Sequence, residues 1–375
     1  MFQSHKTTKS LTWHAARKSV DGQMSHPADS LSWKLVDDKW PEFGKEPRNL
    51  RLALSSDGFN PHSSLSSRYS CWPPGNDIDV YLEPLIDYLK SLWDGIRGVY
   101  DAHIGEYFTL RGVLLWTVND FSAYGNLSGC IVKGYKTCPI CGDDTPSHRQ
   151  RAAFNEKPEY GTPSEPLNGE EVLHIVEDIN YIWGSKNGGS VGENDGDRVC
   201  WKKKSKFFDF EYWKYLHVRH VLDVMHIEKD VCNSIVGTLL EILGKNKDGI
   251  AAWLDLLNMG VKTDLQPEYR QRRTRLPPGP WNFSRAEKRA VCNSFYGIKV
   301  PEGYCSNIKN LVSLKDSRLL GLKSHYCHTL MQQLLLVAIR SILEKPAKHA
   351  ITRLCFFFSA MCAKTVDVSK LDKLE

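Results

Sequence analysis

The sequence lacks any long hydrophobic run. One of its longest apolar stretches, residues 334–339, is far shorter than the ~20 residues that a membrane-spanning helix needs. The first ten residues, MFQSHKTTKS, contain no apolar segment of the kind that a secretory signal requires. No internal repeat recurs at a fixed period. These absences predict a chain without a membrane span, a secretory signal or a repeat architecture.

A strong charge of one sign is missing as well. The chain has 49 Lys and Arg against 44 Asp and Glu, and the net charge of +5 permits nucleic-acid binding without requiring it. Two basic runs, 202–206 and 270–275, would suit a phosphate backbone, although solvated surface loops are the commoner origin of such runs. The candidate DNA-binding residues are therefore Lys202, Lys203, Lys204, Arg272 and Arg273.

The cysteines number 11 and are scattered, which, without a secretory signal, predicts reduced intracellular thiols. Only one CxxC occurs, at Cys138 and Cys141, and it is half of a zinc knuckle that needs two further ligands. The nearest plausible partners are His217, His220 and His226. On one continuous helix, His220 and His226 point about 120° apart, so they share a zinc only if the helix begins after His220. The alternative is a pair of buried reduced cysteines.

Glu228 interrupts an apolar stripe. Read as one helix, residues 219–240 place on a single face Val221, Val224, Met225, Val231, Cys232, Ile235 and Leu239. Glu228 lies midway between Val221 and Ile235 on that face. Burying an unpaired carboxylate there would cost on the order of several kcal/mol. Either the helix is misassigned or a cationic group meets Glu228, and a metal ion is the leading candidate.

Two aspartates stand at the ends of expected strands. Apolar residues alternate at positions 50, 52 and 54, which predicts a strand that ends before Asp57. The continuous apolar run 111–120 predicts a buried strand that ends at Asp120. The stretch between them, residues 76–106, has helical spacing of its apolar residues.

Three carboxylates in this order suit a two-metal phosphoryl-transfer site. Asp57, Asp120 and Glu228 together could hold two Mg²⁺ ions about 4 Å apart. One ion would activate the attacking water or hydroxyl, and the other would stabilise the leaving oxygen. The alternative is that each strand-end aspartate is a turn residue.

The chain divides into three stretches. Residues 1–48 are polar and interrupted by proline, residues 49–276 form the core with an irregular insertion at about 121–215, and residues 277–375 read mainly as helices. The proline-rich junction at 277–280 marks the last boundary, and residues 330–343 are the clearest helix beyond it.

In four long segments the chain closely resembles the transposases of plant CACTA (En/Spm-type) DNA transposons. The resemblance covers almost the whole chain and rests on Asn49–Pro61 (NLRLALSSDGFNP), Trp116–Cys141 (WTVNDFSAYGNLSGCIVKGYKTCPIC), Tyr212–Leu240 (YWKYLHVRHVLDVMHIEKDVCNSIVGTLL) and Leu311–Cys362. The last segment resembles the domain of unknown function that commonly follows the transposase core.

The resemblance implies an α/β fold with an RNase H-like core, a mixed sheet with helices and a Cys/His-containing insertion, followed by a mainly α-helical region. It implies a DDE triad of Asp57, Asp120 and Glu228 that binds Mg²⁺ or Mn²⁺, and a Zn²⁺ held by Cys138 and Cys141 with His220 and His226. The implied reaction is hydrolysis at the transposon end, then attack of the freed 3′-hydroxyl on target DNA.

The same resemblance implies partners and a compartment. The expected partners are transposon terminal-repeat DNA and other transposase chains, with no membrane and no small-molecule substrate, and the expected location is the nucleus.

Three departures from the family pattern change the expectation. Pro73 is joined directly to Pro74, so only residues 63–72 remain where an RNase H sheet needs two strands. A basic, aromatic stretch that usually follows the CxxC is absent before residue 152, and the chain begins near the core and stops inside the trailing domain. We expect a truncated, internally deleted transposase-derived protein that is inactive alone. The alternative is a non-catalytic DNA-binding or protein-interaction relic stabilised by zinc.

Overall fold

A computed structural model describes most of the chain, and its residues fall into two compact units. The described residues are 2–17, 20–56, 77–132, 134, 136–145, 164–179, 181–182, 189–190, 200–242, 250, 253–254, 257, 266, 268–270, 273–275, 277, 279, 281–299 and 307–373. Unit 1 comprises Met1–Ser147, Gly161–Asp223 and Asp367–Asp372, and unit 2 comprises His148–Tyr160, Val224–Val366 and Lys373–Glu375. Each unit is described by itself below.

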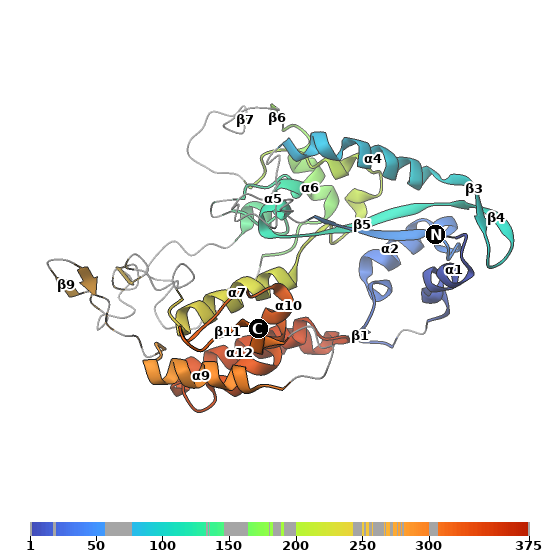
Figure 1. The fold of residues 1–375 in the computed structure, drawn as a ribbon. Helices are drawn as coiled ribbons and strands as arrows, with labels where there is room; N and C mark the ends of the chain where they lie inside the picture. The colour runs from blue at the N-terminus through green and yellow to red at the C-terminus, as the bar shows by residue number, and fades with distance from the viewer. Residues whose placement is uncertain are drawn as a thin grey trace. The chain divides into compact units, whose positions relative to one another are not determined.

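A parallel three-stranded sheet forms the centre of unit 1 (Figure 1). Its order is β2 (Leu50–Ser56), β5 (Gly112–Asn119) and β8 (His220–Leu222). Both strands expected beside the aspartates are present, because their apolar side chains pack into the core: Val113, Leu114 and Leu115 of β5 are almost fully buried. Parallel pairing brings the C-terminal ends of all three strands to one edge.

Helix α4 (Ile78–Asp94) covers this sheet but is shorter than the sequence predicts. It ends before Gly95, whose φ of 111° takes the backbone out of helical geometry. The following residues form an antiparallel pair, β3 (Ile96–Asp101) and β4 (Glu106–Leu110), so the helical assignment of residues 96–106 is wrong. A side chain at Gly95 would lie 2.8 Å from Thr109 Cγ2, which makes glycine the fitting residue at this corner.

The N-terminal elements pack on unit 1 as short helices and turns, as the prolines predict. They are α1 (His5–Leu11), η1 (Trp13–Ala16), β1 (Gln23–Met24), η2 (Pro27–Asp29), α2 (Leu31–Lys39) and α3 (Pro41–Gly44). Figure 1 shows α4 on one side of β5 and α2 on the other. The core of the unit joins Val36 of α2, Ile86 of α4 and Leu115 of β5 with aromatic residues such as Trp213.

The expected insertion contains mostly short elements. They are α5 (Phe121–Ser128), η4 (Gly142–Asp144), α6 (Gly169–Val176), β6 (Tyr181–Ile182), β7 (Gly189–Ser190), η6 (Lys206–Asp209) and η7 (Trp213–Tyr215). A separate hydrophobic cluster holds it together through Cys130, Val172, Val176, Cys200 and Trp201. The irregular character predicted for residues 121–215 is therefore confirmed where the structure describes them, apart from helices α5 and α6.

The helix expected from residue 219 begins later. Residues 220–222 form strand β8, and α7 runs from Val224 to Leu239. The apolar stripe predicted for this helix is confirmed only in part. Cys232 and Leu239 are buried, whereas Met225 is 43% exposed. A three-residue strand is too short to show a period-2 pattern, so its residues merged with the helical pattern that follows.

Unit 2 is mainly helical and has its own core. After α7 come β9 (Glu268–Arg270), β10 (Arg273–Arg275), α9 (Arg285–Gly297), η8 (Ile308–Leu311), β11 (Val312–Ser313), β12 (Arg318–Leu319), α10 (Ser324–Thr329), the π-helical turn η9 (Leu330–Leu334), α11 (Leu335–Ile339) and α12 (Lys345–Met361). Strand β13 (Val366–Asp367) and η10 (Val368–Lys373) follow α12, and residues Asp367–Asp372 of these elements belong to unit 1, where β13 pairs with β1. The helix expected at 330–343 is confirmed up to Ile339, with a π-helical first part. Within the described residues, no helix is both long enough and apolar enough to cross a membrane.

Candidate functional site

The C-terminal edge of the unit 1 sheet aligns three strand ends. Ser56 pairs with Asn119, and Asn119 pairs with Leu222. In the sequence each of these residues is followed by an aspartate: Asp57, Asp120 and Asp223. Asp57 lies outside the described residues, so its position is not described. The sequence analysis missed Asp223, although it follows a short apolar stretch as the other two do.

A chain of polar side chains crosses the sheet beneath this edge. Ser56 Oγ donates to Asn119 Oδ1 at 2.6 Å, and Asn119 Nδ2 donates to Thr117 Oγ1 at 2.7 Å. Thr117 Oγ1 lies 2.8 Å from His220 Nδ1. The chain therefore links β2, β5 and β8, and its buried members, Asn119, Thr117 and His220, are each hydrogen-bonded as buried polar groups must be.

Asp120 caps helix α5. Its Oδ1 accepts a hydrogen bond from the backbone N–H of Ala123 at 2.7 Å. This is the turn-residue role that the sequence left open, and it is worth ~1 kcal/mol. The backbone N–H of Asp223 donates to the carbonyl of Asn119 at 2.8 Å, which extends the β5–β8 pairing to the start of α7.

Glu228 is buried, as its place on the apolar stripe predicts. It lies on α7 in unit 2 with 0% of its surface exposed. The partner of Glu228 among the described residues is an imidazole: Glu228 Oε2 lies 2.7 Å from Nδ1 of His328. The second oxygen, Oε1, has no hydrogen-bond partner in the described part of the chain, an omission that costs about 1–3 kcal/mol for a buried polar atom.

The expected triad is divided between the two units. Asp120 belongs to unit 1 and Glu228 to unit 2, while Asp57 lies outside the described residues. The joint action of these three carboxylates therefore stays a prediction.

The CxxC forms a tight knuckle in unit 1. The backbone N–H of Gly142 donates to the carbonyl of Cys138 at 2.8 Å, and Gly142 takes the positive φ of 59° that this turn requires. Next to it, the chain brings together two cysteines that the sequence analysis missed: Cys130 Sγ lies 3.2 Å from Cys200 Sγ.

Further contacts join the two thiol pairs into one cluster. The Cys200 N–H donates to Asp143 Oδ1 at 2.7 Å, and its thiol lies 3.6 Å from the carbonyl oxygen of Cys138. Burial raises the pKa of the Cys141 thiol, and the neighbouring Cys138 and Cys200 raise it further. Burial together with the nearby thiols also raises the pKa of Tyr124. Four thiols are the donor types of a structural zinc, but no three of these described sulfur atoms lie within 4.8 Å of one another.

The two histidines expected at this zinc do not join the thiols. His220 is buried against Thr117, Phe207 and Trp213, and burial followed by the charge of Arg219 lowers its pKa to about 3. His226 lies on α7 in unit 2, with Nε2 3.7 Å from Asp230 Oδ2. His220 is therefore committed to the core of unit 1, since its ring packs between aromatic side chains, and the zinc ligands stay a prediction.

The first basic run is largely internal. Lys203 is 1% exposed and forms an ion pair with Asp79, with Nζ 3.0 Å from Oδ1. Lys202 Nζ donates to Asn126 Oδ1 at 3.1 Å, and burial lowers its pKa to about 8. Only Lys204 of the three offers an exposed charge, so the assignment of Lys202 and Lys203 as phosphate contacts is corrected. Arg272 and the side chain of Arg273 lie outside the described residues.

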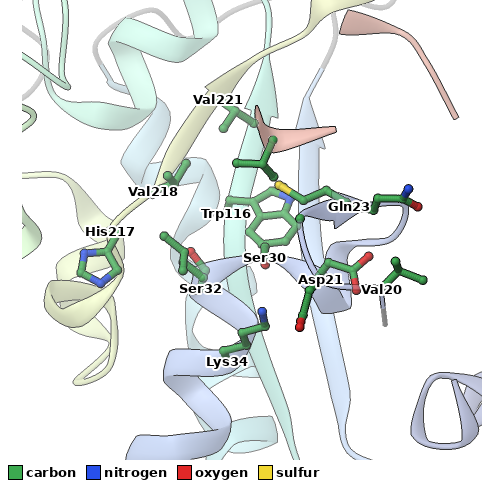
Figure 2. Close-up of a pocket in the computed structure, with 15 residues that line it drawn as sticks. Val20, Asp21, Gln23, Ser30, Ser32, Lys34, Trp116, His217, Val218 and Val221 are labelled. Carbon is green, nitrogen blue, oxygen red and sulfur yellow. The ribbon is translucent and has the colours of Figure 1, made fainter. Parts of the chain in front are cut away.

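A cavity of about 680 Å³ lies on unit 1 away from these groups. Figure 2 shows Trp116 among its lining residues, with Val218, Val221 and Lys34 also lining it. The lining contains none of the predicted carboxylates or cysteines.

A family model described as transposase family tnp2 matches residues 21–73 and 74–157, which is less than half of the chain. The matched stretches contain Asp57, Asp120, Cys130 and the CxxC, but not Cys200 or Glu228. No curated protein and no solved structure matches the chain. The family match supports a transposase-family protein, for which binding to DNA is the general expectation.

Proposed function

We propose that the chain is a transposase-derived protein of the CACTA (En/Spm) type with an RNase H-like core. Its ancestral reaction is metal-dependent DNA strand cleavage and transfer at transposon ends, and this form is inactive alone. The observation that carries the proposal is the parallel register in which Ser56 pairs with Asn119. Because the next residues are Asp57 and Asp120, two carboxylates continue from paired positions of adjacent strands.

The donor set at this edge suits a hard divalent cation. Asp57 and Asp120, with Glu228 as the third carboxylate implied by the resemblance, would hold Mg²⁺ or Mn²⁺, which prefer oxygen ligands. Such ions supply activation of the attacking hydroxyl and stabilisation of the leaving oxygen. The chain's own contribution is rigidity: the polar chain from Ser56 through Asn119 and Thr117 to His220 locks the three strand ends in register.

Two observations support inactivity of this form. The family match is split between residues 73 and 74, at the junction where the sequence predicts a missing segment. In addition, the Glu228 carboxylate is enclosed in unit 2 and held by His328 rather than open to solvent. A carboxylate already engaged by His328 is less available to a magnesium pair, so this arrangement favours a silent triad.

A nicking assay tests the proposal. Purified chain is incubated with terminal-inverted-repeat DNA and Mg²⁺ or Mn²⁺, beside Asp120→Asn and Glu228→Gln. Asparagine keeps the cap on Ala123 and removes only the charge, so the variant isolates metal binding from folding. We expect salt-dependent DNA binding without nicking by any of the three proteins. Metal-dependent nicking that both substitutions abolish would show an active nuclease instead. Absence of DNA binding would contradict the proposed transposase origin.

The second candidate function is a zinc-stabilised binding module. It is favoured by the two thiol pairs, Cys130 with Cys200 and Cys138 with Cys141, which tie segments 70 residues apart. A zinc held by these thiols would staple the insertion to strand β5 through helix α5 without taking part in chemistry. The exposed Lys204, together with Arg272 and Arg273, would supply the cationic contacts to DNA.

Metal analysis tests the zinc. Cys200→Ser should lose one zinc per chain relative to the unaltered protein, whereas Cys292→Ser should lose none. Cys292 is a matched control because it is equally buried, and burial alone raises the pKa of its thiol. Zinc content that is unchanged in Cys200→Ser would leave only a cluster of reduced buried thiols. DNA binding whose salt dependence survives replacement of Lys204, Arg272 and Arg273 would exclude these residues as the phosphate contacts.

A further inference from the structure

We propose that unit 2 contains a separate metal site formed by Glu228, His328 and Cys362, which takes a borderline divalent cation such as zinc. The three residues come from different elements: α7, α10 and the C-terminal cap of α12. One potential ligand atom from each lies within 4.8 Å of the other two, and no other such group of three occurs in the described part of the chain. Ligands of one tetrahedral zinc lie ~3–4 Å apart, so small side-chain movements suffice.

The buried carboxylate is the independent sign of a ligand. Glu228 has 0% of its surface exposed, yet Oε1 has no hydrogen-bond partner among the described residues. His328 meets only Oε2, at 2.7 Å. A plain Glu–His pair would leave this asymmetry in place, whereas a cation bound at the carboxylate would compensate its charge and the desolvation of both oxygens.

The donor types select the ion. One carboxylate, one imidazole and one thiolate form a mixed oxygen, nitrogen and sulfur set, which suits zinc. Magnesium prefers an octahedron of oxygen ligands, so this cluster does not fit it. The His328 side chain is 34% exposed, which leaves a side open for water as a fourth ligand.

The local helix geometry agrees with a built site. A π-helical turn, Leu330–Leu334, follows His328 directly, and single π-helical turns occur frequently at functional sites. Its Gln332 Nε2 lies 3.2 Å from His328 Nδ1, so the turn contributes a polar side chain beside the imidazole. Cys232 and Cys355 are buried and close enough to Glu228 for its charge to act on both thiols. Contact with Cys327 raises the pKa of Cys232, burial raises the pKa of Cys355, and the Glu228 charge raises both further.

This site does not depend on the proposed transposase origin or on the zinc in unit 1. It bears on the proposed magnesium triad, because a cation bound to Glu228 in unit 2 occupies the oxygens that the triad would use. Cation binding at the cluster and at the four thiols of unit 1 can be measured separately, since the two sets share no residue.

The experiment measures zinc and cobalt bound to the full chain after chelation and readdition. His328→Gln and Cys362→Ser should each lose one equivalent, or weaken its binding at least about tenfold, while Cys292→Ser keeps it. With cobalt, thiolate charge-transfer absorption assigned to this site should vanish in Cys362→Ser and persist in Cys200→Ser. Circular dichroism confirms that each variant is folded.

The outcomes separate the two sites. A single equivalent that is lost in His328→Gln but kept in Cys200→Ser would support the unit 2 site even if the unit 1 zinc is absent. Metal content and cobalt absorption unchanged in both His328→Gln and Cys362→Ser would overturn the proposal and leave Glu228 and His328 as a simple hydrogen-bonded pair. So would the absence of any stoichiometric metal in the unaltered chain.

Discussion

Mild acid should destabilise unit 1 through His220. This imidazole lies under the strand-end edge, is 7% exposed, and packs against Phe207 and Trp213 with Nδ1 close to Thr117 Oγ1. Burial, followed by the nearby Arg219 charge, lowers its pKa from the ordinary 6.5 to about 3. The folded protein therefore keeps His220 neutral at pH values where the unfolded chain is protonated.

The sign and size of the effect follow from that difference. Above pH 6.5 both states carry a neutral imidazole, and stability does not depend on this group. Between 6.5 and 3 only the unfolded state binds the proton, so folding loses ~1.4 kcal/mol per pH unit. At pH 5 the loss is ~2 kcal/mol, which is a large fraction of the ~5–15 kcal/mol stability of a typical domain.

Urea unfolding at pH 7, 6 and 5, followed by tryptophan fluorescence, measures this loss. His220→Gln should flatten the pH dependence by ~2 kcal/mol between pH 7 and 5. His174→Gln, at an exposed position of α6, should leave it unchanged. His14 and His26 also have lowered pKa values, so the difference between the unaltered chain and His220→Gln is the decisive quantity.

Equal slopes in the unaltered protein and in His220→Gln would refute the reasoning. If His220→Gln does not fold, NMR of the ring protons answers the same question in the unaltered chain. The His220 resonances should then show no titration between pH 7 and 5, and a midpoint near 6.5 would contradict the buried neutral state.

Three further outcomes follow from the contacts. Lys203→Met should lower the free energy of unfolding of unit 1 by about 3–5 kcal/mol in urea unfolding, because the buried Asp79 loses its partner. Adding Asp79→Leu to this variant should recover most of that loss. An unchanged free energy of unfolding in Lys203→Met would contradict the buried pair. Asp120→Ala should cost ~1 kcal/mol through the lost cap whereas Asp120→Asn costs only a few tenths, and equal losses would refute the cap assignment. Chelation should lower the thermal midpoint of the unaltered chain by more than that of Cys200→Ser, and an equal shift in both would show that the thiols of unit 1 hold no metal.

The strands were predictable because their signal is local. Alternation at residues 50, 52 and 54 and the apolar run that precedes Asp120 both depend on neighbours within a few positions, and β2 and β5 formed where expected. The burial of Glu228 was predictable for the same reason, since its place on the stripe needs only the sequence of α7. The extended helix over 96–106 failed because Ile96 fits a helical spacing, while Gly95 ends the helix through its backbone conformation.

The partners of the functional groups were not predictable in this way. Cys200 meets Cys130 across 70 residues, and His328 meets Glu228 across 100 residues. The prediction that Lys203 contacts DNA was wrong for the same reason. Lys203 belongs to a basic run, but its pairing with Asp79 makes it an interior residue. A sequence pattern reports which face a residue prefers, and only the packing of distant segments decides what it meets there.

The sequence by itself determined that Asp57 and Asp120 would follow β-strand segments and that Glu228 would be buried. Tertiary structure alone decided that Ser56, Asn119 and Leu222 share one edge, that Cys130 meets Cys200, and that His328 contacts Glu228. The physical reason is range: hydrophobic periodicity acts over one or two turns of chain, whereas strand register, thiol pairing and buried ion pairs are made between segments that only folding brings together.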